Sequence, residues 1–413
     1  MSVNNKFLTN HLFFFNLLII NNYFLHLISA NIFFLKFNLI AILIYFFFFI
    51  FKSFKNNNNL IVILIIYYLI IILGSPTQDH DARSIWLFHA KRIYYDYNIY
   101  SQLDGYGEFS QNDYNPFVAS LSASLGHLVN NWNEVLPKFS NLILTVPAIL
   151  FLNFFFKNKL SKIFFFLSVL IIFDKRIVNG EMDAILALYL VSTLLIFFQF
   201  FLNKNLPFKL FVFEGLLATT FATIFLLIKS EAIVSFLFIL FILFIFKYFR
   251  LIQFELKKLL ILIIFPFSFF LHWKLKVFNS GIKNWYIDSI DYEFIKYRLF
   301  NFKLYIQIFE GLLLNKSMFI SCIIFFSTLS IFLLNYYNSY FIVKKNSFEN
   351  KFYLFTSIYC FLYFIFLFFI FIFGKQETKM FLEQGAFRYT QLISFSLVYS
   401  SFLIIDRNIL KKN

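Results

Sequence analysis

The chain has 413 residues, of which 61% are hydrophobic, 24% are aromatic and only 14% are charged. About a quarter of the residues in a soluble globular domain are charged, so this composition excludes an ordinary soluble protein. Collagen-like, disordered and disulfide-scaffold chains are excluded as well. The sequence predicts an all-α integral membrane protein that forms a single polytopic domain over residues 1–413.

A membrane-spanning helix needs about 20 predominantly apolar residues. Hydropathy predicts about twelve spans, some of them short, at 11–29, 33–51, 59–74, 138–156, 161–175, 182–202, 209–228, 231–249, 257–273, 316–336, 352–373 and 389–405. No small-residue cleavage site follows the first span, which is therefore interpreted as a retained helix. Cys322 and Cys360 lie inside apolar segments, which predicts inert core thiols.

The distribution of Lys and Arg predicts the orientation of these spans. With the N-terminus in the cytoplasm, the inner connections and helix ends hold eighteen basic and three acidic residues, whereas the outer side holds seventeen of each. The formal charge of +15 then lies on the inner side, as the positive-inside rule requires. We expect both termini in the cytoplasm and a bacterial inner (plasma) membrane location. We interpret the excess of Lys and Arg as a signal for membrane orientation and lipid contact, and not as a nucleic-acid binding surface.

Three outer loops, at 75–136, 274–315 and 374–388, are long and rich in polar residues. Connections between neighbouring helices usually have about 2–8 residues, and long loops often carry function. The first loop predicts two short amphipathic helices at the membrane interface. The first helix has Trp86, Ala90, Ile93 and Tyr97 at helical spacing, and the second has Phe117, Leu121, Leu125 and Leu128. Asn115 is the expected N-cap of the second helix, with Pro116 at its first position. A lid that only covers the helices would show the same pattern.

Two carboxylates, Asp79 and Asp81, stand near the start of the first outer loop. Such a pair can act as a general base or hold a divalent cation, although solvated loop carboxylates would look the same. Charged residues also lie at the outer ends of later segments: Glu181, Asp183, Lys229, Glu231 and Arg388. Charges facing one compartment are what a polar cavity at the outer interface requires.

Several short motifs occur in a fixed order along the chain. They are Asp81-Ala82-Arg83-Ser84-Ile85-Trp86, Ala90-Lys91, Asp113-Tyr114-Asn115-Pro116, Gly180-Glu181-Met182-Asp183 with Ala187-Leu188-Tyr189, Lys229-Ser230-Glu231-Ala232 and Arg388-Tyr389. Over residues 59–400 this series resembles polytopic glycosyltransferases of the GT-C fold, which include the dolichyl-phosphate-mannose protein mannosyltransferases and the aminoarabinose transferase of lipid A. Two departures concern donor and acceptor contacts. His89 stands where relatives tend to have Lys, and Asn115 interrupts their Tyr-Pro pair.

The resemblance implies inverting transfer of a sugar from a polyprenyl-phosphate donor to a lipid, glycan or protein acceptor at the outer face. The base would be Asp81, or else Asp79, and Asp81 is preferred because it leads the matching Ala-Arg-x-x-Trp run. The leaving lipid phosphate needs basic donors at headgroup depth. The expected substrate-binding residues are Arg83, Lys91, Arg92, Asp113, Tyr114, Glu181, Asp183, Lys229, Glu231 and Arg388. No cofactor is certain, but Asp79 and Asp81 could hold a divalent cation.

Three other classes of protein remain open on the sequence. A transporter or flippase would be expected to carry charged or Gly/Pro-broken positions near mid-membrane, whereas most charges here lie at the outer ends. An envelope-polysaccharide polymerase or ligase would use basic residues of a late loop, and Lys296, Arg298 and Lys303 keep that alternative open. A purely structural membrane protein is the third alternative.

Overall fold

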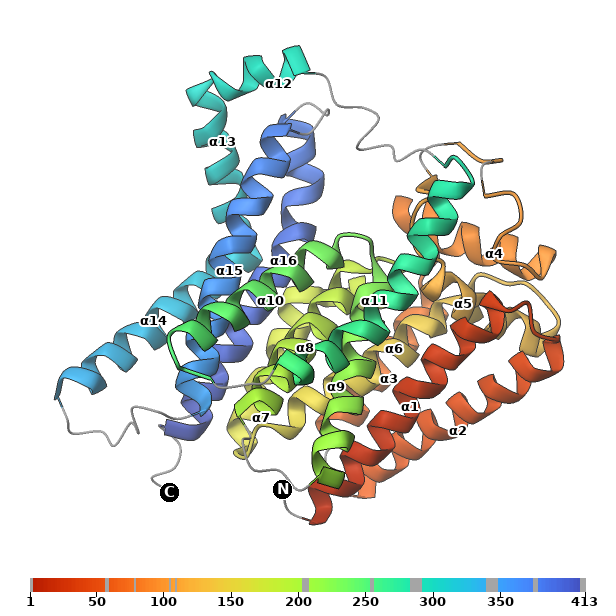
Figure 1. Cartoon of the computed structure of the whole chain (residues 1–413), viewed down its shortest axis with the longest axis horizontal. Helices are drawn as coiled ribbons and strands as arrows, with labels where there is room; N and C mark the ends of the chain where they lie inside the picture. Colours follow the sequence, from red (N-terminus) through yellow and green to blue (C-terminus); the bar gives the residue numbers. More distant parts are fainter. Residues whose placement is uncertain are drawn as a thin grey trace. The chain divides into compact units, whose positions relative to one another are not determined.

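The computed structural model describes residues 3–55, 59–77, 79–103, 105–107, 110–202, 208–252, 256–282, 292–338, 348–373 and 378–408. Regular structure in this part of the chain is helical, with no β-strand (Figure 1). The chain forms two compact units. The first comprises Met1–Leu152, Lys175–Ile233 and Phe254–Asn284, and the second comprises Asn153–Asp174, Val234–Gln253 and Trp285–Asn413.

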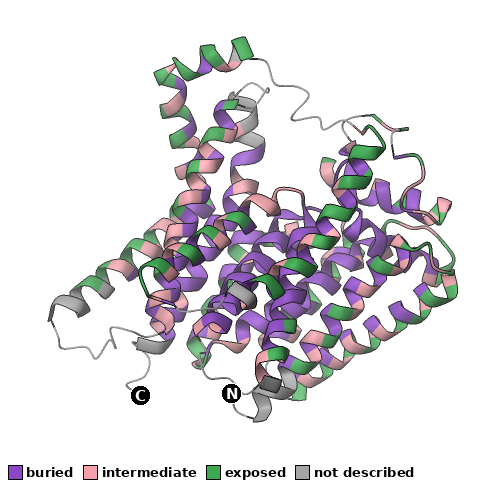
Figure 2. Ribbon diagram, in the orientation of Figure 1, coloured by how far each residue is buried: buried purple, intermediate pink, exposed green. Residues whose placement is uncertain are grey.

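The first unit holds the N-terminal helices and the first long loop, at residues 75–136. Its helices are α1 (Val3–Leu27), α2 (Ile32–Lys55), α3 (Asn59–Gly74), α4 (Leu87–Asp96), α5 (Phe117–Val129), α6 (Val135–Phe154, except its last two residues), α8 (Asp183–Leu202), α9 (Phe208–Ile228) and α11 (Leu256–Asn279). α8 is buried along almost its whole length and packs against α9, as the burial colours of Figure 2 show. A helix that is apolar all round in this way belongs inside a bundle.

α2 shows the opposite arrangement, because one of its faces is both apolar and exposed. Its buried side includes Leu39, Ile42 and Phe46, whereas Phe33, Phe37, Ile40, Ile44, Phe47 and Phe51 are 46–68% exposed. The exposed residues recur every three or four positions, which places them on one stripe. A stripe of this size would be unfavourable in water, so it indicates a face turned toward lipid.

The second unit contains α7 (Lys159–Phe173), α10 (Ala232–Tyr248, except its first two residues), α12 (Tyr292–Leu299), α13 (Phe302–Leu313), α14 (Lys316–Asn338), α15 (Phe348–Phe373) and α16 (Thr378–Asn408). α16 packs against α7, α13, α14 and α15. At its end the Asp406 carboxylate accepts hydrogen bonds from the backbone N–H groups of Lys157 (3.0 Å) and Asn158 (2.9 Å). Asp406 thereby satisfies donors at the start of α7, which a helix cannot pair internally.

Six helices in the described part of the chain contain a stretch long and apolar enough to cross a membrane: α2, α6, α8, α9, α11 and α15. A seventh span is counted if α13 and the first part of α14, bent by 75°, form one broken span. The structure is therefore that of an α-helical membrane protein, and of the predicted spans it supports six or seven.

The difference from the predicted count of about twelve has a physical reason. Every predicted apolar segment overlaps a helix, but α3, α7 and α10 have only 16, 15 and 17 residues. At about 1.5 Å per residue they fall short of the roughly 30 Å hydrocarbon core. α1 and α16 are longer, but polar residues interrupt them, for example Asn16 in α1 and Gln391 in α16.

The two helices predicted in the first outer loop both form. α4 is amphipathic, with Ala90 and Ile93 buried and Lys91 exposed. α5, by contrast, is buried from Phe117 to His127 and packs against α1, α2, α4 and α9. The expectation that α5 is amphipathic, with one face exposed, is therefore wrong. Its residues Ser120, Ser122, Ser124 and Gly126 are small enough for helices to pack on every side.

Of the two cysteines predicted to be core thiols, Cys360 is buried and Cys322 is partly exposed. Cys322 and Cys360 are both free, and Cys360 is buried. Its thiol lies 3.8 Å from the backbone carbonyl of Ile393 in α16.

Candidate active site

The segment that carries Asp79 and Asp81 leaves α3 and enters a π-helical turn over Ala82–Trp86. The Asp79 carboxylate accepts a hydrogen bond from the side-chain amide of Asn179, which precedes α8. Gly180 has φ +107°, and a Cβ atom at this position would lie 2.4 Å from the Cβ of Ala82. Only glycine permits both this backbone conformation and this close approach. The loop before α8 is thereby held directly against the segment of the candidate base.

A buried ion pair lies at the start of α8. Lys229 Nζ donates to Asp183 Oδ1 at 2.9 Å, and their side chains are only 4% and 3% exposed. Lys229 Nζ also lies 3.7 Å from Glu231 Oε1. The Tyr114 hydroxyl donates to that same Glu231 oxygen at 2.6 Å. Residues from three distant parts of the sequence therefore meet through direct contacts.

A second Lys–carboxylate pair adjoins the first. Lys274, near the end of α11, donates to Asp113 Oδ2 at 3.2 Å and to the Ser230 hydroxyl at 3.1 Å. The indole N–H of Trp273 donates to the Asp113 backbone carbonyl at 3.0 Å. The Asp113 side chain is 2% exposed, so this carboxylate depends on Lys274 for compensation of its charge.

We call these contacts the carboxylate network. It comprises Asp113, Asp183 and Glu231 with the partners Lys274, Lys229, Ser230 and Tyr114. The Asp79–Asn179 hydrogen bond is a separate contact. Trp86 packs beside it, with its ring centroid 5.7 Å from that of Tyr114. All these residues belong to the first unit.

Several buried polar atoms in or beside the carboxylate network have no hydrogen-bond partner among the described residues. They are Trp86 Nε1, Gln111 Oε1, Asn112 Oδ1 and Glu231 Oε2. Most buried polar atoms in folded proteins are hydrogen-bonded, so each exception calls for a reason. One donor and three acceptors of this kind suit a ligand that carries several hydroxyl groups.

The remaining predicted residues of the first unit are placed in different ways. Asp81 is 21% exposed, with Oδ1 3.8 Å from His80 Nδ1, and Arg83 is exposed. Glu181 is buried and lies 4.0 Å from Arg176. Their assignments as base and substrate contacts stay predictions.

The two basic residues of α4 differ in solvent exposure. Lys91 is exposed, whereas the buried Arg92 donates to the backbone carbonyls of Ser101 and, at 3.1 Å, Ile99. Arg92 thus closes the loop that follows α4. Its predicted role as a phosphate ligand is not tested by this contact.

His89, the departure from the family pattern, is 6% exposed, and its Nε2 lies 2.8 Å from the carbonyl oxygen of Ser110. The carbonyl can only accept, so Nε2 carries the proton. Burial lowers the pKa of His89 to about 4, and the positive charge of Arg92 acts in the same direction. His89 is therefore neutral near pH 7 and braces the loop between α4 and α5.

Arg388 lies in the second unit, half-buried in α16. Its predicted role as a contact of the donor phosphate stays a prediction. Of the other late-loop residues, Lys296 and Lys303 are exposed and Arg298 is buried.

The sequence allows a divalent cation at Asp79 and Asp81. In the described residues no group of three or more His, Cys, Asp or Glu side chains is placed to hold a metal ion. Magnesium commonly uses one or two carboxylates together with substrate phosphates. A cation at this pair remains a prediction.

Sequence reasoning did not find Asn179, Ser230, Trp273 or Lys274 as partners in this region. Ser230 lies within the motif Lys229-Ser230-Glu231-Ala232, and Asn179 directly precedes the motif that begins at Gly180. Their positions in the sequence could therefore have identified both residues. Nothing in the sequence marked Lys274 as a partner of Asp113 except its position at a predicted outer helix end, because the two residues are 161 positions apart.

Comparison with protein-family models, curated proteins and solved structures gave no match to the chain.

Proposed function

We propose that this protein is a membrane glycosyltransferase that moves a sugar from a polyprenyl-phosphate donor to an envelope or lipid acceptor. The observation that carries the proposal is the carboxylate network. Asp113, Asp183 and Glu231 come from separate parts of the chain and are joined through Lys229, Lys274, Ser230 and Tyr114, whose ring lies against that of Trp86. The hydrogen-bonded Asp79 and Asn179 precede Asp81 and Asp183 by two and four residues. The unpartnered buried donor and acceptors there support a hydroxyl-rich ligand such as a sugar.

The chemistry needs a base but no nucleotide fold, because the donor already carries its activated bond. In the proposed reaction Asp81, or alternatively Asp79, takes the proton from the acceptor hydroxyl as its oxygen attacks the anomeric carbon. The bond from that carbon to the phosphate oxygen breaks, and polyprenyl phosphate leaves with the electron pair. Attack from the face opposite the phosphate inverts the anomeric configuration.

The basic residues fall into two groups, one that holds the loops in place and one that could contact the leaving phosphate. Lys229 and Lys274 are engaged by carboxylates and hold the loops in place. The exposed residues Arg83 and Lys91 are free of such a buried pair and are candidates to meet the growing charge on the leaving phosphate. Arg388 is the proposed phosphate contact of the second unit.

The proposal includes a location and a topology. We place the protein in a bacterial inner membrane, with both termini in the cytoplasm and residues 75–136 outside. The about twelve spans of a GT-C-like arrangement then include α1, α3, α7, α10 and α16, and the short helices among them cross where the bilayer is locally thinned. Cysteine labelling in intact cells tests the orientation. An impermeant reagent should modify Asp104→Cys and not Asn408→Cys, and the reverse result contradicts the topology.

Transfer itself is tested with the purified full-length protein in detergent. Radiolabelled polyprenyl-phosphate sugars are supplied together with an envelope lipid extract, and label in the acceptor fraction is measured for the parent and for Asp81→Asn. We expect label transfer by the parent only, and an inverted anomeric configuration by NMR of the product. Transport of the labelled lipid across vesicles without covalent transfer would favour the flippase alternative instead.

A further inference from the structure

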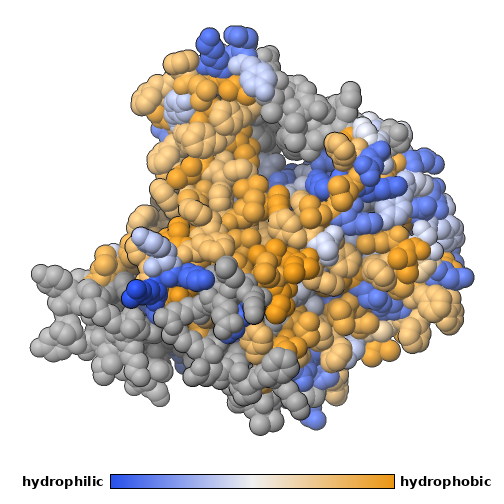
Figure 3. Space-filling model, viewed as in Figure 1, coloured by the Kyte–Doolittle hydropathy of each residue, from blue (hydrophilic) through white to orange (hydrophobic). Residues whose placement is uncertain are grey.

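Lys138 is a buried cation in the first turn of the candidate span α6, and it is 3% exposed. The first long loop ends just before it, and Figure 3 shows hydrophilic side chains over α4 of that loop. Lys138 Nζ donates to the backbone carbonyl oxygen of Ser75, just beyond the end of α3, at 2.6 Å. An ammonium group has three donors, so two remain. The first turn of a helix is also an unfavourable place for a cation, because the N-terminal end carries partial positive charge.

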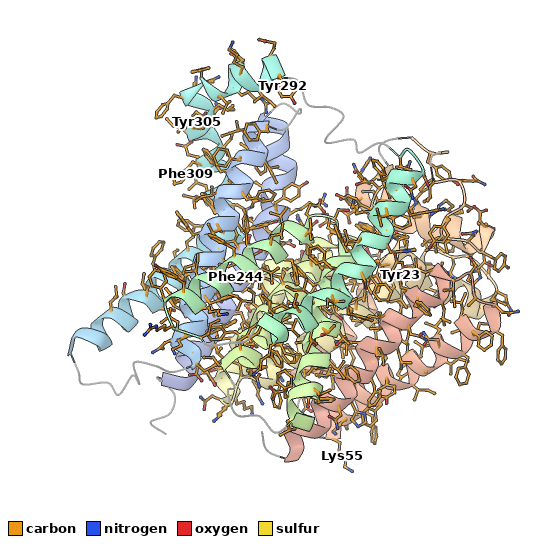
Figure 4. The ribbon with its side chains drawn as sticks, in the orientation of Figure 1. Tyr23, Lys55, Phe244, Tyr292, Tyr305 and Phe309 are labelled. Carbon is orange, nitrogen blue, oxygen red and sulfur yellow. The ribbon has the colours of Figure 1, made fainter. Side chains whose placement is uncertain are left out.

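No carboxylate in the described part of the chain pairs with Lys138. Lys229 and Lys274 of the same unit meet carboxylates at 2.9 and 3.2 Å, whereas no described Asp or Glu oxygen lies within 4.0 Å of Lys138 Nζ. Glu134 is the acidic residue nearest in sequence, and it is exposed. Side chains fill the space between the helices of this unit, as around Tyr23 in Figure 4. A buried charge without a partner is costly, so Lys138 calls for an anion that the described residues do not supply.

Two polar side chains close to Lys138 also lack partners among the described residues, and both can donate. Asn141 follows Lys138 by three positions in α6, which places the two on one face. Its Nδ2 is buried and unpartnered, while its Oδ1 accepts from the Ser140 hydroxyl at 3.4 Å. Thr77, two positions beyond Ser75, has a buried, unpartnered Oγ1. An ammonium group, an amide N–H and a hydroxyl together form a donor set that suits a phosphate.

An apolar gap leads from this donor set along the candidate span α6. The gap lies between α3 and α6, and its lining includes Ile61, Ile65, Tyr68, Leu142, Thr145 and Ile149. Leu142 and Thr145 follow Lys138 and Asn141 by four positions, so the gap and the donor set share one face of α6. The gap has a volume of only about 10 Å³. A chain enters it only if α3 and α6 separate, and one chain needs less separation than the two chains of a glycerophospholipid.

We propose that Lys138, Asn141 and Thr77 hold the phosphate of a polyprenyl phosphate whose chain enters the gap between α3 and α6. The inference rests on the proposed function, which supplies a lipid of this kind as donor and as leaving group. Thr77 precedes the candidate bases Asp79 and Asp81 by two and four residues, so the phosphate is held near the segment that carries them. The chain then lies along a membrane-spanning helix.

The test uses the full-length protein in detergent with farnesyl phosphate as the probe. Farnesol, inorganic phosphate and dioleoyl phosphatidic acid are the comparison ligands, and calorimetric titration gives the affinities. The parent should bind farnesyl phosphate more tightly than the other three ligands. Lys138→Met should weaken that binding about tenfold or more, the loss expected for a hydrogen bond to a charged group.

Thermal unfolding midpoints separate a ligand site from a structural contact. Without ligand, Lys138→Met should unfold at the parent's temperature or above it, because the variant lacks an uncompensated buried charge. Asn141→Leu should weaken farnesyl phosphate binding severalfold without lowering the midpoint, because it removes a buried amide that has no partner for its N–H group. Lys36→Met is the matched control, since Lys36 belongs to the same unit and donates to the neutral Oδ1 of Asn130 at 2.7 Å. It should leave the affinity unchanged.

Unchanged affinity in both Lys138→Met and Asn141→Leu would overturn the proposal, as would an equal loss in Lys36→Met. A lower ligand-free midpoint in Lys138→Met with unchanged affinity assigns Lys138 to capping α3 and overturns it too. Farnesol that binds as tightly as farnesyl phosphate would exclude a phosphate contact, and tighter binding of phosphatidic acid would exclude a single-chain lipid.

The binding assay does not depend on catalysis, so the two proposals can fail separately. If no sugar transfer is detected but the expected affinities are found, the phosphate site stands and the transferase does not. If transfer is detected but the variants bind farnesyl phosphate like the parent, the transferase stands and the phosphate site does not.

Discussion

Charged side chains are placed in opposite ways in the carboxylate network of the first unit and in α12 and α13 of the second unit. In the network, Asp113, Asp183 and Lys229 are at most 4% exposed, and each meets an opposite charge within 3.2 Å. In α12 and α13, Lys296 and Lys303 are exposed next to the exposed rings of Tyr297 and Phe302. A buried unpaired charge costs several kcal/mol, whereas water or lipid headgroups solvate an exposed one. The contrast is between buried charges that are paired directly with opposite charges in one unit and exposed charges beside aromatic rings in the other.

The largest effect is expected at the candidate base. Asp81→Asn should reduce sugar transfer by about 10²–10⁴-fold, because the amide cannot accept the acceptor proton. Expression and folding should be unchanged, since Asp81 is partly exposed. Turnover is measured with labelled donor, and Asp96→Asn in α4 is the matched control. If only Asp79→Asn loses sugar transfer, Asp79 is the base instead of Asp81. Normal turnover in both variants would contradict a general base at either position.

The next effect concerns the buried pair. Lys229→Met should destabilise the protein by about 3–5 kcal/mol, because Asp183 is left buried without its cation. Lys229→Met combined with Asp183→Asn should recover much of that loss. Thermal unfolding midpoints in one detergent make the comparison. If the single variant unfolds at the parent's temperature, the pair does not hold the site together.

A smaller effect depends on pH through His89. Its pKa is about 4 in the folded protein and about 6.5 when unfolded, so the unfolded chain binds the proton first as pH falls. Stability should therefore decrease from about pH 6.5 down to pH 4 and be constant below, by on the order of 3 kcal/mol. His89→Gln keeps a donor for Ser110 but cannot titrate, so its unfolding midpoint should depend less on pH. Identical pH profiles for parent and variant would exclude this role.

The smallest effect is expected at Arg388 in the second unit. If it binds the donor phosphate, Arg388→Ala should weaken donor use by about 1.5–3 kcal/mol, and Arg388→Lys should also weaken it, because a point charge lacks the planar fork of guanidinium. The apparent donor affinity is measured at fixed acceptor. An interfacial anchor would be served equally by Lys, so parent-like donor dependence in both variants assigns Arg388 to anchoring.

The sequence located the helices well, and α3 occupies the predicted residues 59–74. Long apolar runs fix helix positions because the backbone must satisfy its own hydrogen bonds in a membrane. The same runs did not fix the number of spans, since helix ends are set by local geometry. Nor did they show that α5 is buried on every side, because its environment is supplied by α1, α2, α4 and α9.

For the candidate site, the sequence selected most of the residues and the tertiary structure decided their partners. The sequence pointed to Asp79, Asp183, Lys229 and Glu231 because charged residues are costly, and therefore rare, in an apolar chain. These four also lie at the predicted outer ends of helices. Which carboxylate meets which cation depends on contacts between distant segments. Asp113 is paired with Lys274 across 161 positions, and Arg92 turns away from solvent to carbonyls only seven and nine residues ahead. No local sequence pattern predicts these pairings, because they result from the packing of the chain in three dimensions.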